Sequence, residues 1–215
     1  MQVEIWSDIV CPWCYIGKRR FEAALAAFDG RDSVSVRYRS FELAPDQAAD
    51  LDQPLAEMLA GKMGVSLAQA QAMNDRVSGI AAEEGLEFHL ERTRPGNTFD
   101  AHRVTHLAAE AGIQDAVVER LHAGYFNEGA RIGVGEVLIR LASDAGLDAD
   151  AVRATLDSGR FTDEVRADEA LARQLGISGV PFFVIDRRYG VSGAQGVDVL
   201  LATLERASKE LALTN

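Results

Sequence analysis

The stretch Cys11-Pro12-Trp13-Cys14 decides how the rest of this chain is interpreted. It follows an apolar run with strand character over residues 2–7 and it opens a helical pattern. These two cysteines are the only ones in 215 residues, so any thiol chemistry of the chain belongs to them. At the start of a helix a Cys-x-x-Cys can close a small disulfide ring, and the free helix N–H groups stabilise a thiolate on the first sulfur. The stretch therefore predicts a redox-active dithiol.

The composition excludes several classes of partner. With 47% hydrophobic and 26% charged residues, the chain is globular and long enough to bury a sizeable core. The formal net charge of −11 argues against a nucleic acid or an anionic membrane surface as the main partner. The first ten residues contain Glu4 and Asp8 and no basic residue, unlike a secretory signal. No stretch has the roughly 18 to 20 apolar residues of a transmembrane helix. We therefore expect a cytoplasmic protein.

Hydrophobic periodicity separates an α/β unit from a block of helices. Residues 2–7 and 34–39 have strand periodicity and residues 12–28 are helical, which indicates a βαβ unit with parallel strands. Helical patterns follow near residues 54–62, 66–84, 98–111, 114–127, 135–145 and 148–157, with 86–90 as a weak strand candidate. The chain closes with a helix at 162–175, strands at 180–185 and 191–193, and a helix at 197–213.

This element order predicts an α/β fold that is interrupted by an all-helical insertion. Residues 1–50 and 162–215 would form one discontinuous domain, and residues 51–161 would form the insertion. Ser66 and Asp148 are predicted to cap the second and sixth of the inserted helices.

Several short motifs resemble those of a known family. They are Ser7-Asp8-Ile9-Val10-Cys11-Pro12-Trp13-Cys14, Phe41-Glu42-Leu43, Asn97-Thr98 followed by Ala101-His102-Arg103, Gly179-Val180-Pro181, and Ser192-Gly193-Ala194-Gln195. Their residues and order resemble the thioredoxin superfamily, in its DsbA-like arrangement with a helical insertion, and more closely the FrnE-like branch. That branch is related to the 2-hydroxychromene-2-carboxylate isomerases and the kappa-class glutathione transferases. The resemblance implies a thioredoxin-like fold of the order βαβ…αββα.

The two cysteines are predicted to have different roles. Cys11 precedes the first helical turn, so we expect its sulfur to be exposed and to attack a substrate disulfide. Cys14 lies one turn further and would be the shielded, resolving thiol. Pro12 suits the first helical position, and Trp13 adds a flat apolar surface without a positive charge. We therefore expect a weaker oxidant than DsbA.

The resemblance also implies roles for residues far from the dithiol. Pro181 would be a cis proline facing the cysteines, and the Val180 backbone would pair with an extended substrate. Asn97 and Thr98 would contact glutathione or substrate, and Gln195 would hold the γ-glutamyl end of glutathione. Helix capping is the alternative for all three of these polar residues.

Three other interpretations of individual residues stay open. Asp8, three residues before Cys11, could tune its pKa or relay protons, or it could be a solvated strand-end carboxylate. The cysteine pair could be structural, although so short a disulfide ring restrains little of the unfolded chain. His102 and His106 could complete a zinc site with the cysteines, but 88 residues separate Cys14 from His102. We expect no metal site, with one histidine packed among the helices and the other solvated.

The leading hypothesis is a thiol–disulfide oxidoreductase that needs no bound cofactor. Its electrons would come from glutathione or a dithiol, and its substrate would be a disulfide- or dithiol-containing protein or a small-molecule thiol. The alternative is a glutathione-dependent isomerase or transferase for a small aromatic or polyketide-like molecule; such relatives usually have serine where this chain has Cys11. A chaperone-like peptide binder with incidental thiols is the third hypothesis. A homodimer stays open for each.

Overall fold

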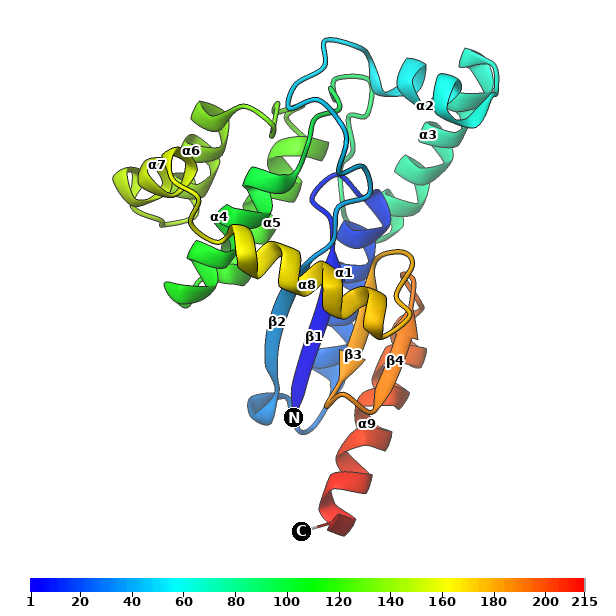
Figure 1. The fold of residues 1–215 in the computed structure, drawn as a ribbon. Helices are drawn as coiled ribbons and strands as arrows, with labels where there is room; N and C mark the ends of the chain where they lie inside the picture. The colour runs from blue at the N-terminus through cyan, green and yellow to red at the C-terminus, as the bar shows by residue number, and fades with distance from the viewer. Residues whose placement is uncertain (215) are drawn as a thin grey trace.

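The fold is built on a four-stranded mixed sheet in the order β2-β1-β3-β4 (Figure 1). The computed structural model describes residues 1–214, with side chains as far as residue 210. The strands are β1 (Gln2–Ser7), β2 (Ser35–Ser40), β3 (Phe182–Ile185) and β4 (Tyr189–Ser192). β1 pairs parallel with β2 and antiparallel with β3, and β3 pairs antiparallel with β4. The predicted parallel βαβ unit is therefore confirmed.

The helices fall into the two predicted groups. The helices beside the sheet are α1 (Pro12–Ala27), α8 (Thr162–Gln174) and α9 (Val197–Thr214). The inserted helices are α2 (Leu55–Met63), α3 (Leu67–Glu83), α4 (Phe99–Glu110), α5 (Gln114–Phe126), α6 (Gly135–Asp144) and α7 (Ala149–Asp157). A short 3₁₀ turn, Arg31–Ser33, leads into β2. The α/β class and the thioredoxin-like fold with a helical insertion are confirmed.

Helices cover both faces of the sheet. Because alternate residues of β1 point to opposite faces, neighbouring residues of this strand pack against different helices. Ile5 packs in a core with Phe21 of α1 and Leu200 of α9, whereas Trp6 packs with Ala172 of α8. Figure 1 shows α8 crossing one face and α1 with α9 on the other. This three-layer arrangement explains why β3 is apolar on both faces.

The inserted helices lie at the end of the sheet where β1 finishes (Figure 1). Their large core includes Leu121, Leu138 and Leu141, and Ile9 and Ile16 belong to the same core. Residues on both sides of the two cysteines are therefore fixed by packing against the insertion. The boundaries at residues 50/51 and 161/162 stay a prediction, and Asn215, at the end of the second segment, lies outside the described residues.

Two predicted strand assignments need correction. Residues 86–90 form no strand: Leu86, Phe88 and Leu90 are buried in alternation, but the segment has only one backbone bond across the fold, from His89 N to Phe126 O. The third strand begins at Phe182 and not at residue 180. Ser66 forms a capping box with Gln69, and the Asp148 carboxylate caps α7, as expected.

Candidate active site

The dithiol lies at the junction between β1 and α1. A turn closes when Cys11 N donates to Asp8 O (3.1 Å), and α1 begins at Pro12 with Cys11 as its N-cap. Cys14 N donates to Cys11 O (3.0 Å), so the two cysteines share the first helical turn. Both are free cysteines in this structure. Cys11 therefore stands at the N-terminal end of α1, where the helix macrodipole is positive.

The expectation that Cys11 is exposed is wrong, because only 4% of the residue is accessible to solvent. The segment before β3 covers it, with Cys11 Sγ lying 3.6 Å from Val180 O. Trp13 is 39% exposed and is the most accessible residue of the four.

Cys14 is as buried as Cys11, but its surroundings differ. Its exposed fraction is 3%, and the Asp8 backbone N–H donates to its sulfur (3.5 Å). Burial raises the pKa of the Cys14 thiol well above its usual range, and the neighbouring Cys11 raises it further. Cys14 therefore carries its proton at neutral pH, which suits a group that must stay unreactive until Cys11 is modified.

The Val180–Pro181 peptide bond is cis, and Pro181 packs directly against α1. A Cβ on Gly17 would lie 2.9 Å from Pro181 Cγ, so only glycine fits this position without a shift. Gly193 N donates to Pro181 O (2.8 Å), which ties the segment to the end of β4. The packing at Gly17 and the bond to Gly193 hold the Val180 carbonyl beside Cys11.

Asp8 is a completely buried carboxylate, so its interpretation as a solvated strand end is wrong. Asp8 Oδ1 lies 3.4 Å from His102 Nε2, and Asp8 Oδ2 accepts a hydrogen bond from Leu43 N (2.8 Å). His106 is also buried and lies 3.2 Å from Asp168, so the expectation of one solvated histidine is wrong as well. Each histidine of α4 is instead buried against its own carboxylate.

Asn97 and Thr98 begin α4, and the structure gives Asn97 a clear local role. The Asn97 side-chain oxygen accepts from Phe99 N (2.8 Å), and its amide donates to Glu42 (3.2 Å) and to Pro45 O (3.0 Å). Thr98 is buried and forms no side-chain cap. Local bonds thus account for Asn97, which stands one residue before the N-cap Thr98 and directly after Pro95 and Gly96, which share a pocket with Pro12.

Gln195 lies in the exposed turn between β4 and α9. Its amide donates to Ser192 O (2.8 Å), so it neither caps a helix nor contacts the cysteines directly. The preceding Ala194 packs near Gly17, because a Cβ added to Gly17 would lie 3.4 Å from the Ala194 methyl group. Gln195 is therefore next to the segment that faces α1 beside Pro181.

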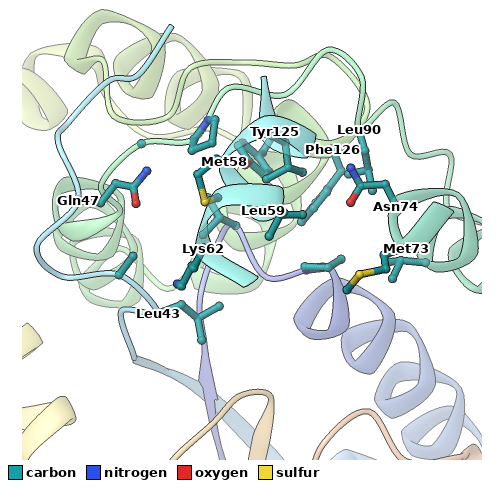
Figure 2. A pocket seen from close by; sticks show the side chains of 17 residues that line it. Leu43, Gln47, Met58, Leu59, Lys62, Met73, Asn74, Leu90, Tyr125 and Phe126 are labelled. Carbon is teal, nitrogen blue, oxygen red and sulfur yellow. The ribbon is translucent and has the colours of Figure 1, made fainter. Parts of the chain in front are cut away.

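An apolar pocket opens next to the dithiol (Figure 2). It has a volume of about 230 Å³ and is bounded on one side by Val10 and Pro12. Figure 2 shows side chains of α2 (Met58, Leu59, Lys62) between Leu43 and Gln47 on one side and Met73 and Asn74 of α3 on the other. The insertion therefore adds a small apolar binding space to the thiol site.

Sequence reasoning missed three contributors to this site. Gly17 carried no signal, because a glycine inside a helix does not show what faces it. His102 was considered as a metal ligand or as a histidine packed among the helices, and not as a partner of Asp8. Leu43 was part of a motif whose place at the pocket could not be inferred. Within the described residues no group of three His, Cys, Asp or Glu side chains could hold a metal ion.

Comparisons with known proteins agree with this geometry. The model of the DSBA-like thioredoxin domain matches residues 2–205. A crystal structure of a probable DsbA oxidoreductase, SCO1869 from Streptomyces coelicolor, is 51% identical, with a TM-score of 0.93 over 98% of this chain and 91% of that chain.

Two more distant structures share the fold. A 2-hydroxychromene-2-carboxylate isomerase is 19% identical, with a TM-score of 0.71 over 100% of both chains. The cytosolic disulfide reductase DsbM from Pseudomonas aeruginosa, solved with glutathione, is 21% identical, with a TM-score of 0.67 over 97% of this chain and 100% of that chain.

Proposed function

The chain belongs to the family of DSBA-like thioredoxin domains, and from this premise we propose that it is a thiol–disulfide oxidoreductase with Cys11 and Cys14 as its redox centre. The observation that carries the proposal is the asymmetry of the two thiols. Both cysteines are buried, but Cys11 lies at the N-terminus of α1 beside Val180 O, whereas Cys14 accepts a hydrogen bond from Asp8 N–H and its pKa is raised by burial. Cys11 is thus placed to attack the substrate first, and Cys14 stays protonated until it attacks Cys11.

The reaction proceeds in two exchanges. The Cys11 thiolate attacks a substrate disulfide, forms a mixed disulfide, and displaces the first substrate thiolate. Cys14 then loses its proton and attacks Cys11 Sγ, so that the Cys11–Cys14 disulfide forms and the second substrate thiolate leaves. The substrate gains two electrons and the dithiol loses two. The reverse sequence oxidises a substrate dithiol.

Glutathione or a dithiol would return the electrons to the protein. The DsbM structure with glutathione supports this choice, and DsbM is a cytosolic disulfide reductase. On the same basis we propose a cytoplasmic location for this chain. Within residues 1–214 no helix combines the length and apolar character needed to cross a bilayer. A homodimer remains a proposal without a structural argument.

The pocket beside Pro12 supports a substrate with an apolar group close to its sulfur. Pro12 lines this pocket, and Leu43, Met58 and Met73 are among the apolar residues of its wall. The same pocket favours one alternative, a glutathione-dependent isomerase for a small aromatic molecule, and the isomerase with this fold supports it. The presence of both thiols favours the oxidoreductase.

Trapping the mixed disulfide tests the proposal. The Cys14→Ser variant should accumulate a covalent adduct with oxidised glutathione or a disulfide peptide, detected by mass spectrometry, and Cys11→Ser should form none. Wild type should pass through the adduct to an internal disulfide. If Cys11→Ser retains turnover with a small aromatic substrate and glutathione, the isomerase reading replaces the oxidoreductase.

A further inference from the structure

The buried position of Cys14 creates a proton-transfer problem. Its thiol must lose a proton before its sulfur attacks Cys11, yet only 3% of the residue is exposed to solvent. Burial keeps the pKa of this thiol well above its usual range, so little thiolate is present beforehand. A base inside the protein would remove the need for solvent to reach the sulfur.

Asp8 and His102 form the buried pair that adjoins this sulfur. Asp8 is fully buried, its backbone N–H donates to Cys14 Sγ (3.5 Å), and its Oδ1 lies 3.4 Å from His102 Nε2. Apart from one another, Asp8 Oδ1 and His102 Nε2 have no hydrogen-bond partner among the described residues. A buried polar atom without a partner is costly, which makes this pair a candidate for function.

A small cavity borders the His102 ring. It has a volume of about 10 Å³, and Ser7 and His102 both line it. This is about the volume at which a cavity can hold a single water. A hydrogen bond with the Ser7 side chain lowers the pKa of Cys14. Ser7 thus contacts the Cys14 sulfur and lines the cavity that also borders the His102 ring.

The groups that face His102 make its ring basic. Burial lowers its pKa, but Asp8, together with Glu42 after β2 and Glu169 of α8, outweighs this effect and raises it above the usual value. Tyr38 and Arg39 of β2 line the cavity beside it.

The acidic cluster also reaches the surface. The Arg166 side chain, 49% exposed, pairs with Glu42 (2.6 Å) and with Glu169 (2.8 Å). Glu42 and Glu169, which face His102, therefore pair with a side chain that reaches solvent.

We propose that His102, held by Asp8, is the internal base that takes the proton of Cys14 when this thiol resolves the mixed disulfide. This inference rests on the proposed function. In the step, the Cys14 proton passes by way of Ser7 and the cavity to the imidazole, and the Asp8 carboxylate stabilises the imidazolium. The Cys14–Cys11 bond forms, the bond from Cys11 to the substrate sulfur breaks, and the substrate leaves as a thiolate. The proton returns to Cys14 when the disulfide is reduced.

The two steps can be timed separately with an aromatic disulfide reagent, dithiobis-nitrobenzoate. Attack by Cys11 releases the first thionitrobenzoate and resolution by Cys14 releases the second, so absorbance reports both. His102→Gln should slow the second release near neutral pH on the order of 100-fold, the scale of a lost general base, and leave the first unchanged. Asp8→Asn should slow the second release at least tenfold, on the same grounds.

His106→Gln is the matched control. His106 lies one turn further on α4 and is also buried against a carboxylate, Asp168, but it does not adjoin the dithiol. We expect this variant to retain the wild-type rate of the second release. Wild type should also show a rate that rises with pH and levels off as His102 loses its proton, whereas His102→Gln should show a rate proportional to hydroxide.

The outcomes separate this inference from the proposed function. Equal second-release rates for His102→Gln and His106→Gln, with the same pH profile as wild type, would overturn the role of His102 and leave the dithiol intact. If wild type shows no second release that depends on Cys14, the oxidoreductase proposal fails, and the inference falls with it. Slower resolution of wild type in D₂O, with an unchanged first step, supports the proton transfer without any substitution.

Discussion

Adding one methyl group at Gly17 should disturb the active site by displacing Pro181. The new Cβ would lie 2.9 Å from Pro181 Cγ, closer than carbon atoms pack, and 3.4 Å from Ala194 Cβ, at the edge of ordinary contact. Overpacking of this kind costs about 1–3 kcal/mol. Alanine also favours a helix interior over glycine by about 1 kcal/mol, so the net loss of unfolding free energy for Gly17→Ala should be roughly 0–2 kcal/mol.

Gly79→Ala isolates the helix-propensity contribution. Gly79 lies inside α3, is exposed, and has no atom within 4 Å of an added Cβ. This variant should be stabilised by about 1 kcal/mol, so the two variants should differ by about 1–3 kcal/mol.

Urea unfolding measures both free energies, and the release of the first thionitrobenzoate measures the reactivity of Cys11. Gly17→Ala should react more slowly, because the displaced Pro181 carries the Val180 carbonyl that lies 3.6 Å from Cys11 Sγ. A Gly17→Ala protein as stable as Gly79→Ala, with wild-type Cys11 reactivity, would refute this reasoning.

Three further predictions concern stability and thiol accessibility. Burial raises the pKa of Glu119, but the hydrogen bond from Arg19 helps to lower it to about 2. The pKa of Glu119 is therefore lower in the folded state than in the unfolded state. Its contribution to the free energy of unfolding, up to roughly 3 kcal/mol, is present above about pH 4.5 and lost as the pH falls toward 2. Glu119→Gln should weaken urea resistance more at pH 6 than at pH 3. Asn97→Ala removes the acceptor for Phe99 N–H and should cost about 1 kcal/mol in urea unfolding, whereas Asn97→Asp should retain this bond. Because the Cys14 thiol stays protonated and enclosed, iodoacetamide at mildly alkaline pH should modify one cysteine of the native chain and both after unfolding; two adducts on native protein by mass spectrometry would contradict this.

Local sequence patterns predicted most of the fold because they act over a few residues. Alternation at residues 2–7 and 34–39 located the parallel strands, and the capping residues Ser66 and Asp148 located two helix starts. The weak strand at 86–90 failed for a long-range reason. Alternating burial is present there, but no neighbouring strand offers a hydrogen-bonding edge.

The candidate site could be predicted only in part, because its environment depends on contacts distant in sequence. Cys11 was expected to be exposed, and Val180, 169 residues away, covers its sulfur. The burial of Asp8 depends on His102 of α4, and neither residue alone indicates the pair. The sequence predicted the chemistry of the site residues and their positions on the helices, but it did not predict the burial of Cys11 and Asp8.

The reduction potential of the Cys11–Cys14 pair tests the central claim most directly. Trp13 lies between the two cysteines and Trp6 lies on the preceding strand, so intrinsic fluorescence in glutathione redox buffers should report the state of the pair. A thiol–disulfide oxidoreductase should show a reversible two-electron couple between roughly −120 and −270 mV, which Cys14→Ser abolishes. The absence of a reversible couple, or a fluorescence change that persists in Cys14→Ser, would contradict the claim.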